Sequence, residues 1–310
     1  MKKKFTKVLV IGPSGIGSVH IREFLRNGFT NLAFIGKSKK KKRFFNLIFE
    51  KSDQLNITNL KNIKNIKNYR PNIVSVCSPT NKHFKHILDC INYTNFIIVE
   101  KPFIWFKNKK KNVLKSAINL LKKTKTKIVV NLPMVSVAKQ FIKKKEIPAR
   151  INLLKFCYYT KGTKFYDEIP IDLLPHALSF LITILKERKL DISRLKIRQF
   201  KTNWSCDFVT GSTVCKFRFK QNSSYKQSTL KFIINKNSYK RHLIQSKDDQ
   251  INYFVKNNHK RIFIKNPMKD YLSYLMGIFS AREKIKSNNN LVLQIIKIKQ
   301  KLLNYNNIKN

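Results

Sequence analysis

The sequence predicts an α/β protein in which a doubly wound parallel sheet is followed by an α+β part with an antiparallel sheet. As far as residue 130, short apolar runs alternate with amphipathic stretches at helical spacing, which is typical of strands buried between helices. From Arg150 the runs become longer and alternate apolar with polar residues between turn signals, as antiparallel strands do. A chain of 310 residues suggests two domains. We place them at 1–130 and 131–310.

The first predicted strand leads into a glycine-rich turn. Val8–Ile11 is wholly apolar, Gly12–Gly17 reads Gly-Pro-Ser-Gly-Ile-Gly, and Val19–Arg26 is an amphipathic helix. A second apolar run, Leu32–Ile35, follows. In this strand–turn–helix–strand context, backbone N–H groups at a helix N-terminus can bind a pyrophosphate. The sequence therefore predicts an N-terminal Rossmann domain that binds a dinucleotide.

The turn departs from the pattern G-x-G-x-x-G at one position. Gly12 and Gly17 occupy the first and third glycine positions, whereas Ser14 stands at the second with Gly15 beside it. We expect Gly12, Ser14, Gly15, Ile16 and Gly17 to bind the cofactor phosphates. An ordinary strand-to-helix turn is the alternative interpretation.

The stretch after the second strand bears on the choice of cofactor. An adenosine ribose 2′-OH in such a site usually meets an acidic residue about 20 residues beyond the loop. Here the sequence reads Gly-Lys-Ser-Lys-Lys from Gly36 and contains no carboxylate. Lys37 and Ser38 suit a 2′-phosphate, which favours NADP over NAD. A solvated lysine run is the alternative.

The remaining elements follow from the same two periodicities. In the first domain they are a strand at 72–77, a helix at 83–92, a strand at 96–99, a helix at 113–121 and a strand at 128–130. In the second domain we expect strands at 151–160, 195–204, 208–219, 227–235, 242–244, 251–255 and 261–264, then helices at 268–285 and 291–303.

Motifs at the ends of these elements form an ordered set. Ser78-Pro-Thr-Asn-Lys-His83 follows one strand, Glu100-Lys-Pro102 follows the next, and Asp172-Leu-Leu-Pro-His176 lies beyond the first domain. With the glycine loop and the following His20, this set resembles the glucose–fructose oxidoreductase / inositol dehydrogenase (Gfo/Idh/MocA) family over about residues 6–180. The family pattern is G-x-G-x-x-G-x-x-H, P-T-x-x-H, E-K-P and D-x-x-x-H. Ser14 departs from it, and no Arg follows Asn131 where family members often carry one.

The resemblance implies a Rossmann domain followed by an α+β domain with a large open, mostly antiparallel sheet. It implies hydride transfer between NAD or NADP and a hydroxyl or ketone carbon of a sugar, nucleotide sugar or cyclitol, in a homo-oligomer. The catalytic residues it implies are Lys101, Asp172 and His176. On the cofactor side it implies Ser78, Pro79, Thr80, His83, Glu100 and Lys101.

The chemistry gives reasons for these residue types. Histidine, with an ordinary pKa of about 6.5, suits two-way proton transfer at neutral pH. A lysine ammonium polarises the reacting oxygen, and a carboxylate holds both cations in place. On a helix, Asp172 and His176 are four residues apart and point the same way. The alternatives are that Asp172 only caps a helix with Pro175 in its first turn, and that His176 is a structural histidine.

The net charge of +49 at first suggests a polyanionic partner. Only 12 of the 65 basic residues are Arg, however, and the lysines are spread along the whole chain. Nucleic-acid binders favour Arg for bidentate contacts. We therefore interpret the charge as AT-rich coding bias and expect no specific nucleic-acid partner. A basic nucleic-acid-binding protein and a catalytically inactive, regulatory dinucleotide-binding family member are the alternative functions.

Composition also predicts a compartment. The apolar run Val8–Ile11 is too short for a signal peptide, and the longest uncharged apolar stretch, 177–185, is far shorter than the roughly 20 residues of a membrane helix. The five cysteines are an odd number and include no C-x-x-C pair. We expect a cytoplasmic protein without disulfide, structural metal or membrane contact.

Overall fold

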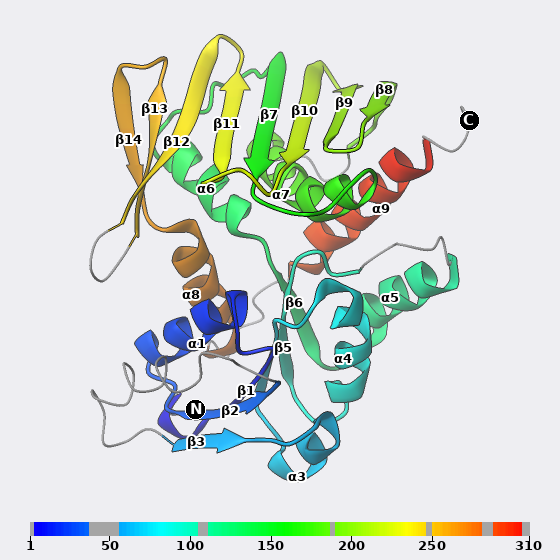
Figure 1. Ribbon diagram of the computed structural model, residues 1–310, viewed down its shortest axis with the longest axis vertical. Coiled ribbons are helices and arrows are strands. Elements are labelled where there is room, and N and C mark those ends of the chain that lie inside the picture. The colour runs from blue at the N-terminus through cyan, green and yellow to red at the C-terminus, as the bar shows by residue number, and fades with distance from the viewer. Residues whose placement is uncertain are drawn as a thin grey trace. The chain divides into compact units, whose positions relative to one another are not determined.

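A computed structural model describes residues 3–36, 56–104, 111–186, 190–245, 250–280 and 288–305 (Figure 1). The chain divides into two compact units, which are described one at a time. The first comprises Met1–Asn131 and Tyr271–Asn290, and the second comprises Leu132–Asp270 and Leu291–Asn310.

The first unit has a parallel sheet of six strands in the order β3-β2-β1-β4-β5-β6. The strands are β1 Lys7–Ile11, β2 Asn31–Ile35, β3 Asn56–Asn59, β4 Ile73–Val76, β5 Phe96–Glu100 and β6 Lys127–Asn131. The strand order reverses between β1 and β4, which makes this the doubly wound Rossmann sheet that the sequence predicts. Every residue of β4 and β5 is buried, because helices cover both faces of the sheet.

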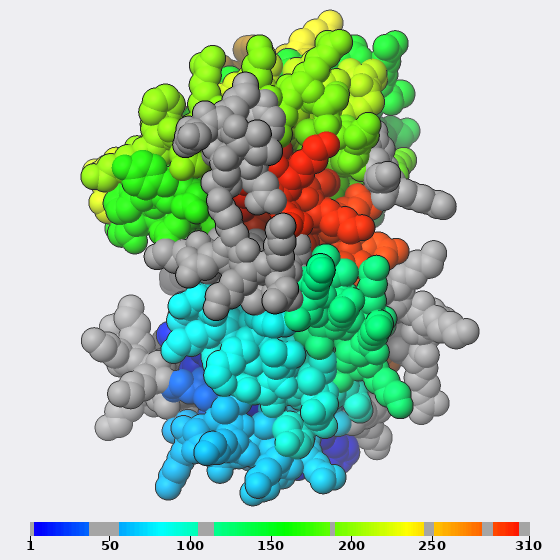
Figure 2. Space-filling view, turned by 90° about the vertical axis from the view of Figure 1, so that its right-hand side faces the viewer, coloured from blue at the N-terminus to red at the C-terminus, as the bar shows by residue number. Residues whose placement is uncertain are grey.

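The helices of this unit lie on both sides of the sheet (Figure 1). They are α1 Ile16–Arg26, α3 Ile66–Tyr69, α4 His83–Cys90 and α5 Lys111–Lys123, with 3-10 turns η1 Lys3–Phe5, η2 Ile63–Asn65 and η3 Thr80–Lys82. Residues of α3 and α4, in cyan, and of α5, in blue-green, form one face of the unit (Figure 2). The amphipathic stripes that predict α1, α4 and α5 are confirmed.

A segment from late in the sequence completes the first unit. Most of α8, Pro267–Ser280, belongs to it. The ring of Phe279 lies 6.3 Å from that of Phe29 and 5.6 Å from that of Phe96. The side chain of Asn288 pairs with the backbone of Val130, its amide donating to the carbonyl at 2.7 Å and its oxygen accepting at 3.2 Å. The first unit is therefore not continuous in sequence.

The second unit has an eight-stranded sheet in the order β14-β13-β12-β11-β7-β10-β9-β8. The strands are β7 Leu153–Thr160, β8 Ser193–Gln199, β9 Asn203–Thr210, β10 Thr213–Gln221, β11 Thr229–Ile234, β12 Asn237–Gln245, β13 Gln250–Lys256 and β14 Lys260–Ile264. Among the described pairs β7 and β10 are parallel, and the others are antiparallel. The expected large, mostly antiparallel sheet is confirmed.

Helices α6 Pro133–Lys143 and α7 Glu168–Leu185 pack on one face of this sheet, here called the inner face (Figure 1). The rings of Phe156, Phe217 and Phe232 stand side by side on this face and are fully buried. Phe232 contacts Phe141 of α6 at 5.1 Å and Phe180 of α7 at 4.7 Å between ring centroids. The α9 helix, Asn289–Tyr305, completes the unit. Among described helices only α7 is long and apolar enough to span a membrane, and 72% of that stretch is buried within the structure.

Three expected strands have the wrong bounds. The run expected at 242–244 is only part of the longer β12. The run expected at 195–204 ends as β8 at Gln199, and the run expected at 208–219 is split between β9 and β10 by a turn at Gly211. Gly211 has a φ of +52°, which glycine adopts without strain. The two-residue turn brings Thr210 and Thr213 opposite each other on the buried face, so the alternation of buried residues shifts by one position across it. The expected helix 268–285 is observed to Ser280, and 281–287 lie outside the described residues.

Candidate active site

The glycine turn lies directly against the loop that follows β4. A Cβ on Gly12, which has a φ of +83°, would lie 2.8 Å from both the carbonyl oxygen of Cys77 and the nitrogen of Ser78. A Cβ on Gly17 would lie 1.9 Å from the carbonyl oxygen of Gly12. Only glycine fits either position, because backbone occupies the space of a side chain. The turn is therefore held at the switch point between β1 and β4.

The middle of the turn is open. Ser14 and Gly15 are exposed, and Ile16, the first residue of α1, is half-buried. Gly15 has a φ of +57°, and no atom lies within 4 Å of where its Cβ would be. The hydroxyl of Ser18 donates to the carbonyl of Gly15 at 2.7 Å. A helix N-terminus with exposed backbone at the end of β1 is the arrangement that accepts a phosphate, so these residues fit the pyrophosphate of a dinucleotide.

The end of β2 also reaches this turn. Gly36 has a φ of +124°, and a Cβ there would lie 3.2 Å from Cδ of Pro13. Lys37 and Ser38, which the sequence assigns to a 2′-phosphate, lie outside the described residues.

Ser78, Pro79, Thr80 and His83 lie beyond the carboxyl end of β4, next to the glycine turn. Pro79 and Thr80 lead into η3, and Pro79 is exposed. His83 is instead buried, with Nδ1 3.0 Å from the carbonyl of Pro102 and Nε2 2.8 Å from the carbonyl of Ser78. Burial lowers the pKa of His83, although both hydrogen bonds oppose this. The ring thus joins the loops that follow β4 and β5.

His86 is a site residue that the sequence interpretation missed. Its Nδ1 lies 2.8 Å from the hydroxyl of Ser78, whose carbonyl is bound by His83. Burial lowers the pKa of His86 as well. The signal that could have revealed it is its spacing, since residues three apart on α4 share a face. Ser78 is therefore fixed by two histidines of one helix.

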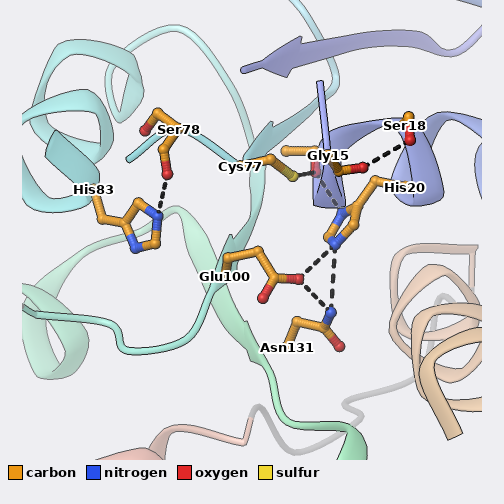
Figure 3. Close-up of polar contacts among 9 residues, drawn as sticks. Gly15, Ser18, His20, Cys77, Ser78, His83, Glu100 and Asn131 are labelled. Atoms are coloured by element: carbon orange, nitrogen blue, oxygen red, sulfur yellow. Dashed lines mark hydrogen bonds and ion pairs between the residues drawn. The ribbon is translucent and has the colours of Figure 1, made fainter. Parts of the chain in front are cut away.

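A buried polar network lies under the ends of β4, β5 and β6 (Figure 3). Nε2 of His20 is 2.7 Å from Oε1 of Glu100, and the amide of Asn131 donates to the same oxygen at 2.5 Å. Nδ1 of His20 is 2.8 Å from the hydroxyl of Ser75. The exposed fractions of His20, Glu100 and Asn131 are 0%, 5% and 0%. These three residues, here called the buried triad, connect α1 to two strand ends.

The charges in the buried triad follow from its contacts. Burial alone would lower the pKa of His20, but charge and hydrogen bonds from Cys77 and Glu100 outweigh it and raise the pKa to about 10. Burial opposes ionisation of Glu100, but His20, Asn131 and the charge of Lys101 lower its pKa. The triad therefore holds an imidazolium beside a carboxylate. Lys101 is half-buried at the end of β5, one residue beyond Glu100.

Asp172 and His176 lie in the second unit, on helix α7, which follows β7 in the chain. Oδ2 of Asp172 is 3.0 Å from Nζ of Lys164 and 3.1 Å from Nε2 of Gln221. The ring of His176 lies 5.3 Å from that of Tyr158. The alternative interpretation, that Asp172 only caps a helix, is wrong, because α7 begins at Glu168 and contains Pro175 in its interior. Within the described residues, no group of three or more His, Cys, Asp or Glu could hold a metal ion.

The strand order and the glycine turn at the switch point define the first unit as a Rossmann unit of the dinucleotide-binding kind. Residues 6–132 match the family model GFO_IDH_MocA, described as "Oxidoreductase family, NAD-binding Rossmann fold". Residues 6–132 therefore match the NAD-binding Rossmann segment of the Gfo/Idh/MocA oxidoreductases. No curated protein matches the chain by sequence.

Solved structures share the fold over nearly the whole chain. A dehydrogenase (MviM) from Clostridium difficile is 13% identical with a TM-score of 0.68, covering 97% of this chain and 99% of that one. The WlbA (WbpB) dehydrogenase from Thermus thermophilus, solved with NAD and UDP-GlcNAcA, is 11% identical with a TM-score of 0.64, covering 95% and 94%. A scyllo-inositol dehydrogenase from Lactobacillus casei is 10% identical with a TM-score of 0.65, covering 98% and 96%.

Proposed function

We propose that this protein transfers a hydride between a nicotinamide dinucleotide and a carbon bearing a hydroxyl or ketone in a nucleotide sugar, sugar or cyclitol. The observation that carries the proposal is the glycine turn, which is packed by Gly12 and Gly17 against the loop after β4 at the sheet's switch point. The similar structures with NAD and UDP-GlcNAcA, and of an inositol dehydrogenase, support this range of substrates.

The bound dinucleotide supplies the hydride acceptor or donor. We assign proton transfer to His176, whose imidazole takes the proton of the substrate hydroxyl during oxidation and returns it during reduction. The ammonium of Lys101 stabilises the negative charge that develops on that oxygen. Asp172 lies one turn before His176 on α7, and its carboxylate is 3.0 Å from the ammonium of Lys164. This ion pair keeps the positive charge of Lys164 near His176. On the cofactor side we assign Ser78, Pro79, Thr80, His83 and Glu100.

The roles of His83 and Glu100 are indirect in this proposal. Both side chains are buried and bound to protein groups, so they hold the loops after β4 and β5 in place. The exposed backbone from Ser14 to Ile16 then takes the phosphates.

NADP is the favoured cofactor in this proposal, because residues 36–40 contain three lysines and one serine but no carboxylate for a ribose 2′-OH. Titration by nicotinamide fluorescence should show tighter binding of NADPH than of NADH. Lys37→Glu should reverse the order, because its carboxylate repels a 2′-phosphate and accepts from a 2′-OH. Equal affinities for NADPH and NADH in both proteins would contradict the NADP preference. Binding of neither dinucleotide would refute the proposed enzymatic function.

The catalytic assignment has its own test. Lys101→Ala and His176→Ala should each abolish turnover of an active sugar substrate while leaving dinucleotide affinity nearly unchanged. Wild-type rates in either variant would show that the residue is misassigned. Dinucleotide binding without turnover over a broad panel of sugars would favour an inactive, regulatory family member instead.

We further propose that the protein forms a homo-oligomer through the outer face of the second sheet and acts in the cytoplasm. On that face Ile244, Ile251 and Phe263 are 46%, 43% and 52% exposed. The five cysteines are free and buried, which suits a reducing compartment. Light scattering should give a mass above that of one chain, and Phe263→Glu should lower it.

A further inference from the structure

Arg241 occupies a specific place on the inner face of the second sheet. It lies on β12, two residues from the buried Tyr239, and pairs across the strands with the buried Phe254, so it points to the same side as both. The carbon of its guanidinium lies 5.7 Å from the ring centroid of Tyr158. The same ring lies 5.3 Å from that of His176. A single tyrosine ring therefore lies in contact with both the guanidinium and the proposed proton-transfer residue.

The guanidinium of Arg241 is not satisfied by the described protein. Its Nε is buried and has no hydrogen-bond partner among the described residues. Buried guanidinium N–H groups nearly always find an acceptor, because leaving one unmade is costly. Arg218 on the opposite face shows the usual solution, with both of its terminal nitrogens bonded to the carboxylate of Asp207. Among the residues that the structure describes, Nε of Arg241 is thus a buried donor without an acceptor.

Two carboxylates of this unit are already bound by lysines. Asp172 pairs with Lys164 at 3.0 Å, and Glu146 pairs with Lys256 and Lys260 at 3.0 Å each. Neither pairs with Arg241, which is half-buried as a whole residue. The fork of a guanidinium matches the two oxygens of a carboxylate or a phosphate.

We propose that Arg241 binds an anionic group of the substrate, and that the substrate is therefore a sugar carrying a carboxylate or a phosphate rather than a neutral hexose or cyclitol. This inference rests on the proposed function and narrows its substrate class. Since Arg241 and His176 both contact Tyr158, the proposal places the anion and the reacting hydroxyl in one molecule. A uronic acid and a sugar phosphate or nucleotide sugar both have their anion within a few bonds of the ring hydroxyls.

The test is calorimetric binding with and without NADPH. The anionic probes are glucuronate, glucose 1-phosphate and UDP-N-acetylglucosamine, and the neutral probes are glucose and scyllo-inositol. Wild type should bind at least one anionic probe more tightly than its neutral counterpart. Arg241→Met should weaken that binding by roughly 10- to 100-fold, as expected for lost hydrogen bonds to a charged group. Arg241→Lys should fall between, since it keeps the charge but loses the fork.

The matched control is Arg261→Met. Arg261 also lies 5.7 Å from a tyrosine ring, that of Tyr253, but on the outer face of the same sheet. The Arg261→Met variant should bind every probe with the affinity of wild type. The glucuronate and phosphate arms identify which anion the site prefers, and thermal unfolding of Arg241→Lys and Arg241→Met checks that both variants are folded.

Three results would overturn the inference: unchanged affinity of Arg241→Met for the anionic probes, binding of neutral probes only by wild type, or no binding of any probe by wild type. If dinucleotide binding fails while anion binding depends on Arg241, the proposed function is wrong and the anion site remains. If dinucleotide binding succeeds and Arg241 has no effect, only the inference fails.

Discussion

His20 is a charged side chain with no exposed surface, 2.7 Å from the carboxylate of Glu100. Moving two ions out of water is costly, and the pair persists only because other hydrogen bonds complete it. Ser75 binds the second ring nitrogen and Asn131 shares the carboxylate oxygen. Replacing one partner would leave the other as an uncompensated buried charge.

The raised pKa of His20 predicts how stability depends on pH. A group whose pKa rises on folding, from 6.5 to about 10, adds stability that is complete below pH 6.5 and is lost as pH rises through 10. His20→Leu should therefore lower the free energy of unfolding by about 3–5 kcal/mol near pH 6. The difference from wild type should shrink by pH 10. Urea unfolding of both proteins at the two pH values measures it.

His20→Gln is the matched variant, because it keeps a donor for Glu100 without the charge. It should recover part of the stability lost in His20→Leu at pH 6 and show little of the pH dependence. A His20→Leu deficit that is equally large at pH 6 and pH 10 would contradict an ionised pair.

The sequence motifs contain His20 and Glu100 but do not predict that they meet. The two residues are 80 positions apart, and their contact depends on how α1 lies across the ends of β4 and β5. The resemblance assigns Glu100 to the cofactor side, and in the structure its carboxylate is bound by His20 and Asn131. Side-chain direction at a strand end is set by packing, which periodicity does not reveal.

At the scale of elements, the sequence best predicts the segment made of β1, the glycine turn and α1. A buried parallel strand is wholly apolar, and a positive φ beside a close backbone contact admits only glycine, so both leave a plain sequence signal. The start of α7 was harder to predict, because Pro170 and Pro175 suggest a helix that begins later than Glu168.

Gly17→Ala tests how tightly the turn is packed. Its Cβ would lie 1.9 Å from the carbonyl oxygen of Gly12, so the backbone of α1 or of the turn must move. We expect a loss of about 1–3 kcal/mol of stability. We also expect dinucleotide binding to weaken by roughly tenfold or more, which corresponds to ~1.4 kcal/mol. Thermal unfolding and NADPH fluorescence titration measure the two effects.

Gly277→Ala is the control for that change. Gly277 lies in α8, is exposed, and has no atom within 4 Å of where its Cβ would be. Alanine there should leave binding unchanged and add up to about 1 kcal/mol of stability, because alanine is the better helix former. Equal effects of the two substitutions would mean that the glycine turn is not packed as described.

At the scale of the whole molecule, the net charge of +49 lowers the free energy of unfolding and does not indicate the function. Of the residues assigned to chemistry, only Lys37, Lys101 and Arg241 are lysine or arginine. Like charges on a folded surface repel, and salt screens them over a Debye length of about 10 Å at 0.1 M.

Raising NaCl from 50 mM to 500 mM at pH 7 should therefore raise the melting temperature by several degrees, because screening removes repulsion that the unfolded chain feels less. Scanning calorimetry measures the change. Near the isoelectric point, pH 10.3, the same salt step should have a much smaller effect. A melting temperature that falls with salt at pH 7 would show that ion pairs outweigh repulsion.

The return of α8 to the first unit has a consequence for how the protein is made. The rings of Phe29 and Phe96, 0% and 2% exposed once folded, pack against Phe279, which is translated only after the whole of Leu132–Asp270. At roughly 5–20 residues per second, that delay is on the order of ten seconds. During this delay the rings of Phe29 and Phe96 on the nascent Rossmann sheet lack their packing partner and are exposed. We therefore expect early chaperone contacts to centre on these two rings.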